Sequence, residues 1–190
     1  MRIIAGEFRS RTLIAPRGDK TRPTTDRARE AVFNVLSNQL NWSETRVLDL
    51  FAGSGALAFE ALSRGALQAT LVENNRFALH AAKENAAALG VQQAVRQLPN
   101  DVYKFLQSPA RGEFELIFAD PPYSDGRTQT ELPELIFANG WLAPGGLCVI
   151  EHRAGQAALA PKGAKILREL NAGEAGFTIL VHQSKENISQ

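Results

Sequence analysis

Two short groups of residues in this chain have the types and spacing that chemistry on a bound ligand requires. Asp120-Pro121-Pro122-Tyr123 follows the apolar run 114–119, and Asp49-Leu50-Phe51-Ala52-Gly53-Ser54-Gly55 ends the apolar run that begins at Val47. The first group offers a carboxylate, proline carbonyls and an aromatic ring, which together can hold an amino group on a flat ring. The second is a glycine-containing turn, through which a backbone can approach a nucleotide-like cofactor closely.

Asp120 and Pro121 suit the amino nitrogen of a guanine or adenine, which carries two N–H donors and a lone pair delocalised into the ring. If the Asp120 carboxylate and the Pro121 carbonyl each accept one hydrogen, the nitrogen moves toward tetrahedral geometry and its lone pair becomes available. Orientation and preorganised electrostatics then supply the catalysis without a strong base. Pro122 fixes the backbone, and Tyr123 stacks on the base. The alternative interpretation is an ordinary proline turn with Tyr123 as a rim aromatic.

The turn at Gly53 and Gly55 indicates a cofactor other than NAD. It lacks the third glycine of the dinucleotide fingerprint, whereas S-adenosylmethionine (SAM) has no phosphate to place on a helix N-terminus. Glu73 lies 20 residues after Gly53, at the end of the next apolar run, where a carboxylate can hold ribose hydroxyls. Asp101 is either an acceptor for the adenine amino group or a helix N-cap before Val102. Taken with the acceptor turn, these residues predict methyl transfer from SAM to an exocyclic nitrogen of a base.

Strands alternate with helices from residue 46 onward, which predicts an α/β, Rossmann-like fold with a mostly parallel seven-stranded sheet and an antiparallel end. The expected strands are 47–51, 69–73, 95–98, 114–119, 146–151, 164–170 and 177–183, and the expected helices are 25–40, 56–63, 75–89, 102–107 and 131–139. Residues 2–5 and 12–15 read as a short hairpin. In a parallel sheet the two motifs would lie at the same carboxyl edge.

The composition is that of a single globular domain of 190 residues with a net charge of +1. Residues 1–30 hold eight Lys/Arg and four Asp/Glu, a local net charge of +4, which suits phosphate contacts or simply a solvated face. A single cysteine, Cys148, excludes an internal disulfide and fits a reducing cytoplasm, and three scattered histidines predict no metal site. No run approaches the roughly 20 apolar residues of a membrane span. We expect a monomer.

Several longer motifs resemble one methyltransferase family. The motifs are Arg2–Gly6, Arg9-Ser10-Arg11, Arg22-Pro23-Thr24, Asp26-Arg27, Arg29–Leu36 and Glu60–Ala66, together with the two turns above. Over residues 2–152 the chain resembles the RsmD-type small-subunit (16S) ribosomal RNA guanine-N2 methyltransferases, which belong to the class I SAM-dependent enzymes. It departs from the family pattern at Ser10, where glycine is usual, and in the segment 176–180, which lacks the expected closing tyrosine.

The resemblance implies methylation of the N2 of one guanine in 16S rRNA, on the assembled or assembling small subunit. It assigns cofactor binding to Asp49, Phe51, Gly53, Gly55, Glu73, Asp101 and Val102, catalysis to Asp120, Pro121, Pro122 and Tyr123, and RNA binding to Arg9, Arg11, Arg22 and Arg27. It also implies an RNA-contacting extension, residues 1–40, ahead of a catalytic domain, residues 41–190.

Three other functions remain open at this point. An adenine-N6 DNA methyltransferase uses the same kind of turn, although such enzymes generally carry a recognition domain for which this chain has no room. A non-catalytic SAM- or RNA-binding module and catalysis on a small amine are the others.

Overall fold

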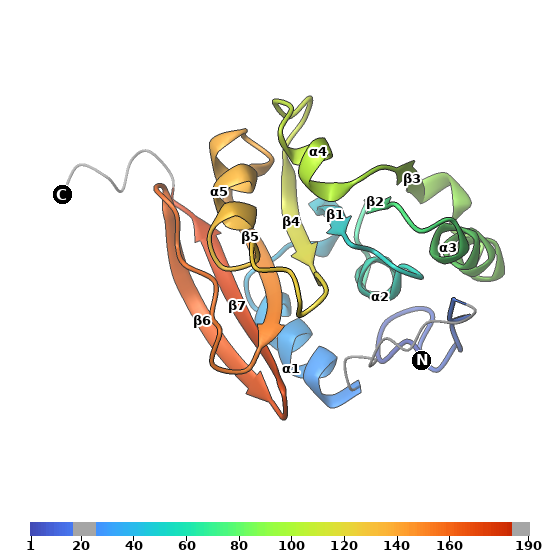
Figure 1. Cartoon of the computed structure of the whole chain (residues 1–190). Coiled ribbons are helices and arrows are strands. Elements are labelled where there is room, and N and C mark those ends of the chain that lie inside the picture. Colours follow the sequence, from blue (N-terminus) through green and yellow to red (C-terminus); the bar gives the residue numbers. More distant parts are fainter. Residues whose placement is uncertain (17–25, 184–190) are drawn as a thin grey trace. The chain divides into compact units, whose positions relative to one another are not determined.

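The computed structural model describes residues 1–16 and 26–183 (Figure 1). By compactness the chain divides into two units, Met1–Val102 and Tyr103–Gln190. The described residues contain seven strands in a mixed, mostly parallel sheet with helices, which confirms the predicted fold class.

The elements begin and end close to the predicted positions. The helices are α1 (Asp26–Ser37), α2 (Ala56–Ser63), α3 (Arg76–Leu89), α4 (Val102–Leu106) and α5 (Glu131–Ala138), with short 3-10 turns η1 (Trp42–Glu44) and η2 (Gln92–Ala94). The strands are β1 (Arg46–Leu50), β2 (Gln68–Glu73), β3 (Val95–Pro99), β4 (Phe114–Ala119), β5 (Leu142–Arg153), β6 (Ala164–Ala172) and β7 (Ala175–His182).

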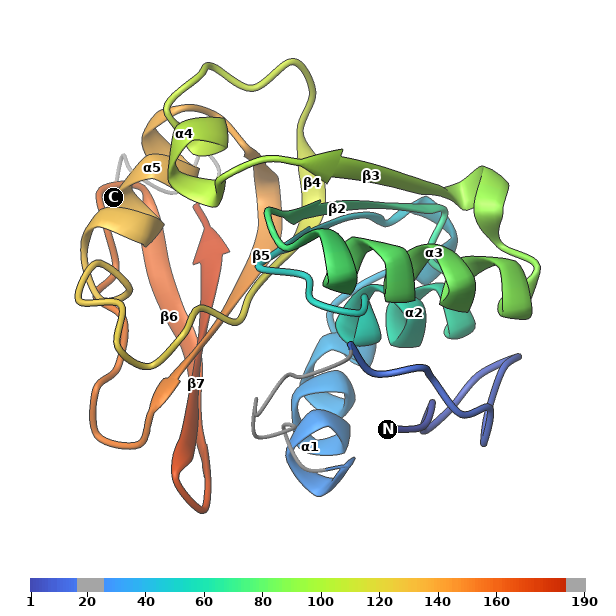
Figure 2. The same ribbon diagram turned by 45° about the vertical axis from the view of Figure 1, so that its right-hand side comes forward.

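In the first unit β3, β2 and β1 are parallel neighbours in that order. The helices α2 and α3 lie together on one face of these strands (Figure 2). The core between them includes the fully buried Phe59 and Leu71, whose side chains both lie against Gly55. Because β1 and β2 are buried along most of their length, they read as continuous apolar runs rather than as alternating ones.

Local sequence sets the ends of α3. The Asn75 side chain accepts hydrogen bonds from Phe77 N and Ala78 N, as an N-cap does. Gly90 ends the helix in the left-handed conformation at φ 76°. These caps explain why the predicted helix 75–89 is nearly correct.

The N-terminal segment, residues 1–16, is held by buried polar groups of α2 and by a few backbone hydrogen bonds of its own. Ile4 N and Ala5 N donate to the Glu60 carboxylate at 2.7 and 3.1 Å, and Ser63 Oγ donates to Ala5 O at 2.6 Å. A Cβ on Gly6 would lie 1.8 Å from Ser63 O, so only glycine allows this approach. The predicted hairpin is present in shorter form: the segments 2–5 and 12–15 are joined by one antiparallel bridge, Arg2 to Thr12, with Ile3 N donating to Arg11 O at 3.0 Å and Leu13 N donating to Met1 O at 2.9 Å. They do not extend into full strands, because Glu60 takes the N–H groups of Ile4 and Ala5.

In the second unit β4 and β5 are parallel, and β7 and β6 follow as antiparallel neighbours. The predicted strand 146–151 is longer in the structure, 142–153. It continues through Pro144-Gly145-Gly146 because the pairing register shifts between Phe114 and Leu116, as at a β-bulge. A Cβ on Gly146 would lie 2.8 Å from Ala143 O, which explains the glycine there.

Candidate cofactor and acceptor sites

The turn after β1 is built from backbone conformations that disfavour side chains. Phe51, Gly53 and Gly55 have φ angles of 58°, 54° and 83°, and a non-glycine residue in this region is uncommon and often marks a functional site. A Cβ on Gly55 would lie 2.5 Å from the Phe59 ring, whereas a Cβ on Gly53 would meet nothing within 4 Å. Gly55 is thus required for packing, and Gly53 borders open space that a ligand can use.

Glu73, at the end of β2, fastens this turn. Its Oε2 accepts from Gly53 N at 2.9 Å and its Oε1 accepts from Asn75 N at 2.8 Å. The structure therefore brings together the glycine turn and the carboxylate that the spacing predicted. Each oxygen still has lone-pair capacity for another donor, because a carboxylate offers about four acceptor sites.

Asp101 and Val102 follow β3, the strand next to β2. Glu73 pairs with Pro99, and Asn100 N donates to Glu73 O at 3.2 Å, so the ends of the two strands are joined. Asp101 is half-buried and Val102 is buried at the start of α4. The predicted cofactor residues thus lie at the carboxyl ends of β1, β2 and β3, and their contact with a cofactor stays a prediction.

Asp49 is almost fully buried, and its Oδ2 accepts from Ala58 N at 3.1 Å in the first turn of α2. Burial raises the pKa of this carboxyl group to about 8; the Ala58 hydrogen bond opposes the shift and the Glu73 charge adds to it. Asp49 therefore joins β1 to the start of α2 and so supports the turn between them. Its role in cofactor binding stays a prediction.

Asn85 is a residue at this site that the sequence reading missed. It is 1% exposed, and its Nδ2 donates to Ser54 O and to Ile14 O, both at 3.1 Å, while its Oδ1 accepts from Ile14 N at 2.7 Å. One side chain on α3 thus joins the cofactor turn to the N-terminal segment. A polar residue on the buried face of an alanine-rich helix was the available signal.

The acceptor turn Asp120–Tyr123 follows β4 in the second unit. Asp120 is half-buried, Pro121 is buried, and Pro122 O accepts from Asp125 N at 2.8 Å, which closes the turn. Tyr123 is 39% exposed and its hydroxyl donates to Glu151 Oε1 at 3.0 Å. A ring this exposed is available for stacking.

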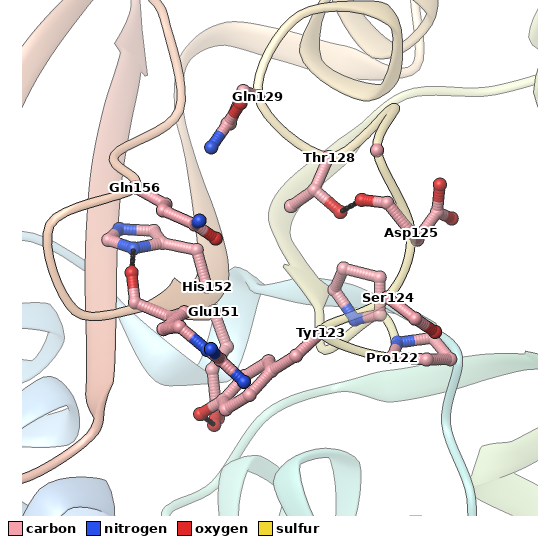
Figure 3. A pocket seen from close by; sticks show the side chains of 12 residues that line it. Pro122, Tyr123, Ser124, Asp125, Thr128, Gln129, Glu151, His152 and Gln156 are labelled. Atoms are coloured by element: carbon pink, nitrogen blue, oxygen red, sulfur yellow. Dashed lines mark hydrogen bonds between the residues drawn. The ribbon is translucent and has the colours of Figure 1, made fainter.

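A pocket of about 170 Å³ adjoins this turn (Figure 3). Its walls are the loop from Pro121 to Gln129 and the end of β5 with the residues after it; the lining is Pro121, Pro122, Tyr123, Ser124, Asp125, Gly126, Thr128, Gln129, Glu151, His152, Arg153 and Gln156. Figure 3 shows Tyr123 and Glu151 together at one end and Gln129 at the other. Asp120 immediately precedes Pro121, the first residue of this lining.

The loop after the acceptor turn is fixed to α4. Tyr103 Oη donates to Asp125 Oδ2 at 2.8 Å, and the Arg127 guanidinium lies 3.5 Å from the centroid of the Tyr103 ring. Burial, followed by the bond to Asp125, raises the pKa of Tyr103. Burial alone would raise the pKa of Asp125, but hydrogen bonds from Arg127 and Tyr103 lower it overall. These partners, 22 residues apart in sequence, preorganise one wall of the pocket.

Of the predicted RNA-binding residues, Arg9, Arg11 and Arg27 are exposed in the first unit. Arg11 Nη2 reaches Ala88 O at 3.4 Å. Arg22 lies outside the described residues. Within residues 1–16 and 26–183, no cluster of His, Cys, Asp or Glu is arranged to hold a metal, and no helix there is long and apolar enough to span a membrane.

Comparisons with known proteins show the family to which this chain belongs. A family model described as Conserved hypothetical protein 95, the RsmD family, matches residues 1–181. The chain is 35% identical over 186 residues to the Ribosomal RNA small subunit methyltransferase D of Escherichia coli, covering 97% of this chain and 91% of that protein. The chain belongs to this family. The match includes both turns and confirms the resemblance seen in the motifs.

Solved structures agree with the RsmD-family assignment. The Escherichia coli protein yhhF superposes with a TM-score of 0.84 at 35% identity, over 97% of this chain and 99% of that one. A Salinibacter ruber RNA methyltransferase, solved with S-adenosyl-L-homocysteine, has a TM-score of 0.65 at 17% identity, over 86% of this chain and 95% of that one. At that identity the second likeness concerns the fold alone, which is the class I methyltransferase fold.

Proposed function

We propose that this protein transfers a methyl group from SAM to the exocyclic N2 of a guanine in 16S ribosomal RNA, on the assembled or assembling small subunit. The observation that carries the proposal is the acceptor turn, where Asp120, the Pro121 carbonyl and the exposed Tyr123 ring adjoin a pocket. The relatives named for small-subunit rRNA methylation support RNA as the substrate class.

The residues of the first unit fit SAM. Gly53 borders open space, so a ligand can approach the backbone there. Glu73 provides acceptor oxygens for ribose hydroxyls, and Asp101 provides one for the adenine amino group. When bound, SAM supplies an electrophilic methyl group on a positively charged sulfur. Phe51, Gly55 and Val102 complete the proposed cofactor set.

In the second unit the acceptor turn binds the base. The Asp120 carboxylate and the Pro121 carbonyl accept the two N2 hydrogens, because Pro122 O is already used within the turn. Both acceptors draw the nitrogen toward tetrahedral geometry and expose its lone pair, and its extra proton leaves after the transfer. Tyr123 stacks on the ring, a contact of about 1–3 kcal/mol.

The N-terminal segment supplies the RNA contacts. Arg9 and Arg11 lie on a segment fixed to α2, and Arg27 is exposed at the start of α1; Arg22 joins this set by resemblance. Their charges neutralise phosphates without reading sequence. We propose that the protein works as a monomer in the cytoplasm, where its buried Cys148 stays a thiol.

The test uses methyl-labelled SAM with three acceptors: unmodified small subunits, deproteinised 16S rRNA and duplex DNA. Nucleoside mass spectrometry of the digested product identifies the methylated base. We expect N2-methylguanosine from the two ribosomal acceptors alone. Comparing the methylation rates of small subunits and of deproteinised 16S rRNA shows whether the protein requires the assembled particle. N6-methyladenine in DNA would replace the proposal with its adenine alternative, and SAM binding without label in any acceptor would leave a non-catalytic module.

Asp120→Ala tests the role of the acceptor turn. The variant should lose transfer and largely keep SAM affinity, because in the proposed mechanism this carboxylate contacts the base and not the cofactor. Glu134→Ala, at an exposed position of α5 in the same unit, is the matched control and should retain full activity. A large loss of SAM affinity in Asp120→Ala would show that this carboxylate serves the cofactor instead of the base.

A further inference from the structure

Glu151 has a place in the second unit that the proposed mechanism does not use. It lies at the end of β5, which runs parallel to β4 with Ala119 paired to Ile150. Asp120 and Glu151 are the next residues along these two neighbouring strands. The parallel register therefore brings the backbone of Asp120, on the acceptor turn, next to that of Glu151, whose side chain lines the pocket.

The surroundings of Glu151 fix its carboxylate at the Tyr123 end of the pocket (Figure 3). The residue is 5% exposed, and its Oε1 accepts from the Tyr123 hydroxyl at 3.0 Å. An ionised carboxylate has no donor, and its two oxygens accept several hydrogen bonds at once. A base stacked on the Tyr123 ring would thus meet an acceptor-only group at its edge.

The purines differ in what they present beside the reacting amino group. In guanine the neighbour of N2 on the Watson–Crick edge is N1–H, a donor. In adenine the neighbour of N6 is an unprotonated N1, an acceptor. A carboxylate next to the amino-binding turn pairs with the first and repels the second.

We propose that Glu151 accepts the N1–H of the target guanine and is the residue that restricts methylation to guanine. The inference rests on the proposed function, since it assigns a specificity-determining residue to the same pocket. A site with a buried polar acceptor strongly rejects an analogue that lacks the matching donor. The alternative role for Glu151 is structural: it accepts the hydrogen bond from the Tyr123 hydroxyl and does not discriminate between bases.

The experiment compares guanine with 2-aminopurine, which keeps the reacting 2-amino group but has an unprotonated N1. After mass spectrometry has located the methylated guanine, 16S rRNA carrying either base at that position is assembled by ligation of a synthetic segment. The ratio of kcat/KM for the two RNAs is measured for wild type and for Glu151→Gln, Glu151→Asp and Tyr123→Phe. SAM affinity and urea unfolding of each variant check that it folds.

We expect wild type to prefer guanine by about 5- to 150-fold, the range of one good base contact. Glu151→Gln should lower this preference at least fivefold, because its amide N–H can donate to the N1 of 2-aminopurine while its oxygen still accepts from Tyr123. Glu151→Asp keeps the charge, so it should keep the preference at a reduced rate.

Two results would overturn the inference. One is a Glu151→Gln variant that loses rate on both RNAs alike and leaves the preference unchanged, since that is the structural role. The other is a wild-type protein with equal kcat/KM for the two RNAs, since Glu151 would then reject nothing. Tyr123→Phe removes the hydrogen-bond partner of Glu151, so a partial change of preference in that variant is expected from coupling. Failure of the proposed function looks different, because wild type itself would then make no N2-methylguanosine.

Discussion

Replacing Glu73 is the sharpest test of the proposed SAM-binding site in the first unit. Glu73→Gln keeps the size of the side chain but removes its charge and one acceptor oxygen. In the structure both oxygens are used, one by Gly53 N at 2.9 Å and one by Asn75 N at 2.8 Å. The amide can preserve one of these bonds and must turn its N–H groups toward the other donor.

The expected magnitudes follow from these contacts. A hydrogen bond to a charged group contributes about 1.5–3 kcal/mol, so losing one to the ribose should raise the Kd for SAM about 10- to 150-fold. The cost to the free energy of unfolding should be smaller, about 1 kcal/mol, because Glu73 is only half-buried and water can replace the lost acceptor.

Isothermal titration with S-adenosyl-L-homocysteine, which is not consumed, measures the affinity, and urea unfolding measures the stability. Glu84→Gln is the matched control, since Glu84 lies on the exposed side of α3, where its carboxylate is 3.5 Å from the His80 ring nitrogen. An unchanged Kd in Glu73→Gln, together with the expected loss of stability, would refute the ribose role and leave Glu73 as a tie for the turn.

Two more predictions concern a buried proton and the RNA-binding segment. Asp49 has its pKa raised from 3.8 to about 8 in the folded protein, mainly by burial, so between these pH values the folded state binds one more proton than the unfolded state. The free energy of unfolding should therefore fall as pH rises across this window, by up to about 1.4 kcal/mol per pH unit. Urea unfolding at several pH values should show a weaker pH dependence for Asp49→Asn than for wild type, and an equal pH dependence would contradict the raised pKa of Asp49. Replacing Arg9 and Arg11 by Ala should weaken RNA binding and reduce the slope of log K against log salt by about 1.4–1.8. Replacing Lys165 and Arg168, which are exposed on β6, by Ala is the control with the same loss of charge. An equal change of the salt dependence in that control would show that Arg9 and Arg11 are ordinary solvated residues and not RNA contacts.

The parts of the fold that depend on local signals could be predicted from the sequence. The turn after β1 could be predicted from Gly53 and Gly55, and their φ angles of 54° and 83° explain why glycine occurs at both positions. Glu73 was identified from its spacing, which a βαβ unit sets. Ser10, with φ 69°, has the left-handed conformation that glycine adopts most easily, which fits the expectation of glycine at this position in the family.

What the sequence could not reveal are polar pairs that form only after folding. Glu60 binds the backbone of Ile4 and Ala5 more than 50 residues away, and Asn85 binds Ile14 across 71 residues. No periodicity encodes these bonds, because each joins one side chain to a backbone group whose type is the same at every position. For the same reason the sequence predicts longer strands in the segment 2–15 than are present, since the N–H groups of Ile4 and Ala5 bond to Glu60 on α2 and that of Ile14 bonds to Asn85 on α3.

The docked N-terminal segment has a consequence for RNA binding that the charge count alone does not contain. A flexible basic tail loses conformational entropy when it binds, roughly 1–2 kcal/mol for each residue that becomes fixed. Here Glu60 and Ser63 fix the segment beforehand, through hydrogen bonds to its backbone of 2.6–3.1 Å, so if Arg9 and Arg11 bind RNA as proposed, less of that cost applies. Asn85 then joins the same segment to the turn at Ser54. If RNA binding displaces the segment, we expect the cofactor turn to shift with it through this side chain, and by linkage SAM binding would then change RNA affinity by the same factor.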